Sequence, residues 1–222
     1  MRRYTKKIKR IVYPPKTINN SVHHVLYINI DERVDRREQL LKTLAIFNPG
    51  KITRISAFKN KNPVLGCTLS HLSAIRHAKK MNYPNVLILE DDAIWSNVLK
   101  GFQIFEKLID NPYDVIMLGG TYPRFNKQTY RVHFSYSAHA YLVHHSYYDR
   151  ILNYAIKTLK IYNPKIHNKD AYAIDVIYSK LQKKDNWLLV YPALMIQGKS
   201  HSNIVGGVVN YKDAFVEKSD TV

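Results

Sequence analysis

Three consecutive carboxylates, Glu90, Asp91 and Asp92, directly follow the apolar run at residues 86–89. Such a run is typical of a strand buried on both faces, so we expect it to deliver the acids to one edge of a sheet. Ligands of open α/β sheets bind at the carboxyl ends of the strands. Adjacent like charges repel unless a cation or strong donors lie among them, and carboxylate oxygens favour Mg²⁺ or Mn²⁺. A simpler alternative is that Asp91 or Asp92 caps a following helix.

A second group of polar residues, Gly66, Cys67, Ser70 and His71, opens the helix expected before that strand. Cys67 and His71 are four positions apart, on one helical face, which is the spacing of a Cys/His catalytic dyad. However, cysteine is more often a small buried filler, and the sequence supplies no evident third group. We therefore favour a structural role for Cys67.

Arginines follow the first expected strand, where a nucleotide would lie in an open α/β sheet. The fork of a guanidinium suits pyrophosphate oxygens, so Arg33 and Arg36 are candidates for donor binding. The alternative is that Arg36 and Arg37 belong to the exposed first turn of a helix, and for Arg37 we prefer that alternative. Asn29 and Asp35 either fix this loop or contact a base.

Strands and helices alternate through the first half of the chain, which predicts an α/β fold with a mostly parallel sheet covered on both faces. We expect strands at residues 24–30, 51–58, 86–89, 114–118, 130–136, 138–144, 188–191 and 194–196. We expect helices at residues 40–47, 67–82, 98–109, 151–159 and 174–181. Several of these helices stop at an Asn-Pro or Tyr-Pro pair, since the residue before proline disfavours helical backbone.

The composition predicts one globular domain with an affinity for anions. The 222 residues include 34 Lys and Arg against 17 Asp and Glu, a net charge of +17. We divide the chain into a flexible basic arm at 1–22, a single domain at 23–205 and a tail at 206–222. One cysteine excludes an internal disulfide, and no apolar window reaches the length of a membrane span. We expect a soluble cytoplasmic protein whose arm attracts anionic membrane surfaces or nucleic acid.

Four segments together resemble glycosyltransferase family 25, the group of lipopolysaccharide-type and collagen galactosyltransferases. They are YINIDERVDRR at 27–37, GCTLSH at 66–71, LILEDD at 87–92 and AIDVIYSKL at 173–181. The resemblance extends over residues 24–204, and its specific part is the pairing of GCTLSH with LEDD across one helix. It implies a GT-A fold of Rossmann type, a UDP-sugar donor, Mn²⁺ or Mg²⁺, and inverting transfer of a hexose, galactose or glucose, to a glycan or protein hydroxyl.

The resemblance also assigns roles to the acidic cluster and its neighbours. The acids would perform the role of the DxD motif, with Asp92 and Glu90 as metal ligands and Asp91 or Glu90 near the ribose. Ser70 and His71 would shape the donor pocket and bind ribose or phosphate, although a structural role for His71 stays open.

Two further sites complete this expectation. A late histidine often completes the metal shell in GT-A enzymes, which points to His201, and Lys199 would screen the β-phosphate. Where family members commonly have Ser-Asp-Ile, this chain has Ser202-Asn203-Ile204. An inverting transfer needs a base for the acceptor hydroxyl, and Asp175, one step off an apolar helix face, is the first candidate, ahead of Asp170.

Two other classes compete with a glycosyltransferase. A basic nucleic-acid-binding module would explain the charge and the 17 tyrosines, but it would not need three carboxylates at a strand end. A phosphohydrolase with an aspartyl nucleophile would need Asp as the first acid, where this chain has Glu90.

Overall fold

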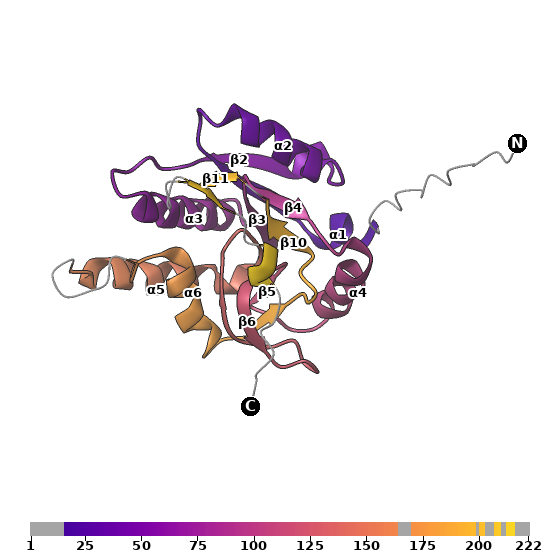
Figure 1. The fold of residues 1–222 in the computed structure, drawn as a ribbon. Coiled ribbons are helices and arrows are strands. Elements are labelled where there is room, and N and C mark those ends of the chain that lie inside the picture. Colours follow the sequence, from indigo (N-terminus) through magenta and orange to yellow (C-terminus); the bar gives the residue numbers. More distant parts are fainter. Residues whose placement is uncertain (1–15, 164–169, 199, 203–206, 210–211, 216–222) are drawn as a thin grey trace, which may run out of the picture.

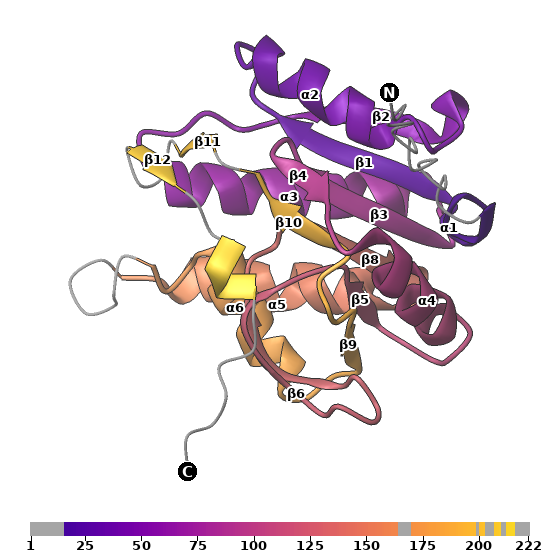
Figure 2. The same cartoon turned by 45° about the vertical axis from the view of Figure 1, so that its right-hand side comes forward.

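The computed structural model describes residues 16–163, 170–198, 200–202, 207–209 and 212–215. A central six-stranded sheet has helices on both faces (Figure 1 and Figure 2). Its strand order is β2-β1-β3-β8-β5-β9, with β1 His24–Asn29, β2 Ile52–Ser56, β3 Asn85–Glu90, β5 Val115–Met117, β8 Ala140–His144 and β9 Trp187–Leu189. The helices are α1 Lys16–Ser21, α2 Val34–Leu44, α3 Pro63–Lys80, α4 Val98–Ile109, α5 Tyr148–Ile161 and α6 Ile174–Gln182.

Short elements complete the described chain. The small sheets pair β4 Ala93–Trp95 with β10 Met195–Gln197, β6 Thr121–Phe125 with β7 Val132–Tyr136, and β11 Ser200–Ser202 with β12 Gly207–Val209. Single 3₁₀ turns are η1 Pro49–Lys51, η2 His145–Tyr147 and η3 Lys212–Phe215. In the described part of the chain, no helix combines the length and apolar character that crossing a membrane requires.

The expected mostly parallel sheet is confirmed, with one reversed strand. β1 pairs in parallel with β2 and β3, and β5 pairs in parallel with β9. β8 lies between β3 and β5 and runs antiparallel to both. The carboxyl ends of β1 and β3 therefore meet the beginning of β8 at one edge of the sheet.

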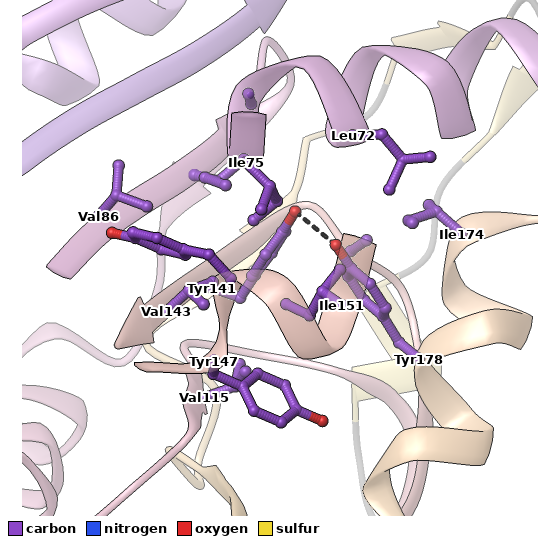
Figure 3. Packing of buried hydrophobic residues seen from close by; sticks show 14 of the residues in the cluster. Leu72, Ile75, Val86, Val115, Tyr141, Val143, Tyr147, Ile151, Ile174 and Tyr178 are labelled. Carbon is purple, nitrogen blue, oxygen red and sulfur yellow. Dashed lines mark hydrogen bonds between the residues drawn. The ribbon is translucent and has the colours of Figure 1, made fainter. Parts of the chain in front are cut away.

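The apolar run of β3 is continuous because both of its faces are covered. Val86 and Ile88 belong to the cluster beneath α3, α5 and α6, part of which Figure 3 shows. Leu87 and Leu89 belong to the cluster formed with α1, α2 and α4. Successive strand side chains point to opposite faces, so every one of these four residues is buried. Each such burial stabilises the fold by about 1.5–3 kcal/mol.

Helix α3 begins at Pro63, four residues before the predicted start at Cys67. The Asn62 side chain accepts hydrogen bonds from the backbone of Val64 and Leu65, and Pro63 occupies the first helical position. Cys67 consequently lies in the second turn of α3, where its side chain reaches the end of β3.

Both predicted terminal segments include residues that pack on the domain. Ile18 and Val22, which we had placed in the basic arm, are buried in the cluster beneath α4. In the predicted tail, Ala214 and Phe215 of η3 are buried, and the Phe215 ring contacts His139 edge-on at 5.1 Å between centroids. The packed structure therefore extends beyond the predicted limits 23 and 205.

Candidate active site

A cleft of about 1100 Å³ opens where β1 and β3 end. Ten of the residues predicted from the sequence line it: Asn29, Arg33, Arg36, Ser70, His71, Glu90, Asp91, Asp92, Asp170 and Asp175. Lys199 lies outside the described residues. The backbone of His201 is described in β11, but its side chain is not, so its predicted role as a metal ligand remains a prediction.

Asp91 anchors the loops that follow β1 and β3. Its Oδ2 accepts a hydrogen bond of 2.8 Å from Nδ2 of Asn29, and its Oδ1 accepts one of 2.8 Å from Nη1 of Arg36. Asn29 also donates to the backbone oxygen of Arg33 at 3.0 Å. These bonds hold the loop 30–33 and the first turn of α2 against the acidic cluster, so Arg36 is not an exposed helix residue.

Asp92 has an unsatisfied carboxylate oxygen. Its Oδ1 is buried and has no hydrogen-bond partner among the described residues, and its Oδ2 lies 3.8 Å from Nη1 of Arg36. Burial, followed by the charge of Glu90, raises the pKa of Asp92 to about 7. An unpartnered oxygen held in place among other carboxylates is the environment that a hard divalent cation fits. The oxygen ligands of Asp92 and Glu90 fit the preference of Mg²⁺ or Mn²⁺, and their assignment as metal ligands stays a prediction.

Glu90 ends β3 beside His71. Nε2 of His71 lies 3.2 Å from Oε1 of Glu90, and the backbone nitrogen of Glu90 donates to the oxygen of His139 at 2.8 Å. Burial is the largest single influence and raises the pKa of Glu90, but the hydrogen bond with His71 and the positive charges of His71, His139 and Arg36 together outweigh it and hold the pKa below its ordinary value. Glu90 is thus kept as a carboxylate facing the cleft.

His71 is completely buried and continues into a chain of hydroxyls. Its Nδ1 lies 2.8 Å from the Tyr141 hydroxyl. The Tyr141 hydroxyl in turn lies 2.9 Å from that of Tyr178 on α6, and Figure 3 marks this hydrogen bond between the two tyrosines. Sequence reasoning missed both tyrosines because they come from β8 and α6, and only the packed structure brings them to α3.

Ser70 ties α3 to the loop after β2. Its hydroxyl donates to the Gly66 oxygen at 2.7 Å and accepts from the Phe58 nitrogen at 2.8 Å. The bonds made by Ser70 shape the wall of the cleft, and its predicted place in a donor pocket stays a prediction.

Asp175 and Asp170 lie on the far wall of the cleft. Asp175 is in the first turn of α6, where its Oδ1 accepts from the Val176 nitrogen at 2.9 Å. Burial raises the pKa of Asp175, and the charge of Glu90 raises it further. Asp170 is exposed. Tyr122, Ser137 and Gln197 also line the cleft, and the sequence motifs gave no role to any of them.

The chain is a mixed α/β protein with a polar cleft at the carboxyl edge of a mostly parallel sheet. The model of glycosyltransferase family 25, described as "LPS biosynthesis protein", matches residues 61–180, more than half of the 222 residues. The chain belongs to glycosyltransferase family 25. The matched segment contains α3, β3 with its three acids, and most of α6.

Solved structures with a similar arrangement include other glycosyltransferases. The glycosyltransferase GlyE of Streptococcus pneumoniae TIGR4 is 12% identical with a TM-score of 0.44, over 77% of this chain and 45% of GlyE. This chain thus spans less than half of GlyE. A glycosyltransferase involved in glycosylation of the major capsid of PBCV-1 is 12% identical with a TM-score of 0.48, over 78% of this chain and 92% of that one. No curated protein matches the chain.

Proposed function

We propose that the protein is a metal-dependent, inverting glycosyltransferase that moves a hexose from a UDP-sugar to a hydroxyl of a glycan or protein acceptor. Membership of family 25 supports the transfer of a sugar. The observation that carries the metal-dependent part is the buried, unpartnered Oδ1 of Asp92 at the mouth of the cleft.

The donor would lie along the ends of β1 and β3. Asp92 and Glu90 would hold the cation, which supplies positive charge to the diphosphate that leaves. Arg36 is fixed by Asp91, and Arg33, paired with Asp35 at 2.7 Å, lies on the same wall of the cleft. Fixed guanidinium groups bind phosphate oxygens without a further loss of side-chain freedom.

The acceptor would approach from the wall formed by α6. Asp175 is our candidate for the base that takes the proton of the attacking hydroxyl. Its raised pKa supports this role, because a carboxylate becomes a stronger base as its pKa approaches the working pH. Asp170, on the same wall, is the alternative base.

A nucleic-acid-binding module is the less favoured alternative. The strongly basic segment at residues 2–10 lies outside both the described residues and the family match. The three acids at the mouth of the cleft would repel a polyanion, whereas a cation and a diphosphate satisfy them.

The experiment is a calorimetric titration with UDP, followed by a panel of UDP-sugars, with and without Mn²⁺. We expect Mn²⁺ to strengthen UDP binding in the natural protein and to have no such effect in Asp92→Ala. The control is Asp149→Ala, which removes an exposed carboxylate on α5 that pairs with Lys79. Equal enhancement by Mn²⁺ in Asp92→Ala and the control would reject the metal assignment, and failure of every UDP-sugar to bind would reject the donor class.

A further inference from the structure

A sulfur, a nitrogen and an oxygen ligand converge on the floor of the cleft. Cys67 and His71 are one turn apart on the same face of α3, and Glu90 ends the neighbouring strand β3. One potential ligand atom from each residue lies within 4.8 Å of the other two. Glu90 is thus the third group that the Cys67–His71 spacing lacked in the sequence.

The imidazole is already oriented as a metal ligand requires. Nδ1 of His71 is engaged by the Tyr141 hydroxyl at 2.8 Å, and Tyr141 is itself held by Tyr178. In proteins, a histidine that binds a metal through one ring nitrogen commonly hydrogen-bonds through the other, which sets its tautomer. Nε2 faces the Glu90 carboxylate and the cleft, and when a metal binds Nε2 the ring proton moves to Nδ1, which then donates to the Tyr141 hydroxyl.

The chemistry of the three ligands differs from that of the acids at the rim. Thiolate and imidazole suit Zn²⁺, whereas Mg²⁺ and Mn²⁺ prefer oxygen ligands. Three protein ligands with one open position form the usual arrangement of an accessible zinc site. We propose that Cys67, His71 and Glu90 form a Zn²⁺ site, with its fourth position open to the cleft.

The surrounding charge favours a cation over a reactive thiol. Burial raises the pKa of the Cys67 thiol well above its ordinary value, and the charges of Glu90, Asp175 and Asp92 raise it further. Without a metal the thiol therefore keeps its proton, which argues against a nucleophilic Cys/His dyad. A divalent cation is attracted by the same charges, and Cys67 releases its proton to solvent when the sulfur binds.

Glu90 belongs to both proposed metal sites, so the two ions compete for it if the proposed function is correct. Zn²⁺ bound to Cys67, His71 and Glu90 removes one ligand from the Mn²⁺ site at Asp92. Zn²⁺ is then expected to weaken the effect of Mn²⁺ on UDP binding.

The zinc site is tested without any donor or activity, by titrating the purified protein with Co²⁺ as a spectroscopic substitute for Zn²⁺. Because the chain has a single cysteine, a near-ultraviolet sulfur-to-cobalt band reports on Cys67 alone. We expect one equivalent of Co²⁺ to produce this band and one equivalent of Zn²⁺ to remove it. Cys67→Ser should abolish the band, and His77→Gln, on the same helix, should leave it unchanged.

A second variant separates the metal site from a folding defect. Tyr141→Phe keeps the ring but removes the hydroxyl that orients His71, so we expect Zn²⁺ affinity to fall by about 10- to 100-fold while circular dichroism is unchanged. The proposal is overturned if folded natural protein gives no sulfur-to-cobalt band in excess Co²⁺, or if Tyr141→Phe binds Zn²⁺ as tightly as the natural protein. Neither result depends on whether UDP binds.

Discussion

The amide of Asn29 donates a 2.8 Å hydrogen bond to Oδ2 of Asp91, between residues that are 62 positions apart in the chain. Asn29 is the last residue of β1, and Asp91 follows directly after β3. The bond closes the edge of the sheet at the point where both strands reach the cleft. Both side chains are buried, so the bond also stabilises the fold.

Replacement of Asn29 by alanine should lower the free energy of unfolding by about 1–3 kcal/mol, because it leaves a buried carboxylate with one donor fewer. Urea denaturation measures this change. Asn111→Ala is the control, since Asn111 is exposed and its side chain donates to the Lys107 oxygen in the last turn of α4, and it should change stability by less than about 0.5 kcal/mol. Equal losses in the two variants would show that the Asn29–Asp91 bond contributes little.

Gly66 is required where α3 passes the loop after β2. A Cβ at this position would lie 2.6 Å from the backbone oxygen of Phe58, which cannot move without moving the wall of the cleft. We expect Gly66→Ala to destabilise the protein by about 1–2 kcal/mol, since overpacking outweighs the helix propensity of alanine. In the control Gly50→Ala the new Cβ meets its nearest atom, Oδ1 of Asn48, at 3.5 Å. The midpoint temperature of thermal unfolding should therefore be unchanged or slightly higher. A similar destabilisation in both variants would contradict this explanation.

Asp175→Asn tests the proposed base. The amide cannot accept the hydroxyl proton, so we expect kcat to fall by about 10²- to 10⁴-fold while UDP affinity stays the same. Asp170→Asn is the matched comparison on the same wall of the cleft, and there kcat should change little. A large fall in kcat for Asp170→Asn with little change for Asp175→Asn would assign the base to Asp170. An unchanged kcat in both variants would show that neither aspartate is the base.

His24 should make stability depend on pH. It is buried, stacks on Tyr83 and lies 2.9 Å from the Thr53 hydroxyl, and burial lowers its pKa below 6.5. The unfolded chain therefore binds a proton more readily, so this contribution to stability is complete above pH 6.5 and is lost as the pH falls through the lower pKa of the folded state. Urea midpoints between about pH 7.5 and about pH 5.5 should fall less steeply in His24→Gln than in the natural protein. His133→Gln, at an exposed position, should keep the natural slope, and identical slopes in all three proteins would contradict the assignment.

Local sequence patterns were sufficient for the elements that carry the acids. The run 86–89 is apolar at every position because both faces of β3 are covered, and the acids begin where that cover ends. The amphipathic spacing of Val98, Phe102 and Phe105 likewise predicted α4. In these segments, periodicity and burial have the same physical cause.

Contacts between segments distant in the chain could not be predicted from local sequence patterns. Residues 138–144 read as a buried strand in either direction, and only packing between β3 and β5 reveals that β8 is reversed. The Arg36–Asp91 pair depends on the meeting of two loops, so the sequence left Arg36 between a donor-binding role and an exposed helix position. The spacing of Cys67 and His71 was visible in the sequence, but the approach of Glu90 required the placement of β3 beside α3.

The short helix α1 is packed on the domain and satisfies a half-buried contact of Lys51. Ile18 and Val22 fill the cluster beneath α4, and the ammonium of Lys51 donates to the backbone oxygens of Asn19 and Val22 at 2.6 and 3.1 Å. A truncated protein that starts at His23, just before β1, would expose apolar residues of the cluster beneath α4. It would also remove the two backbone oxygens that accept hydrogen bonds from the Lys51 ammonium. A protein truncated within the basic arm that begins at Lys16 or earlier keeps α1 and these contacts.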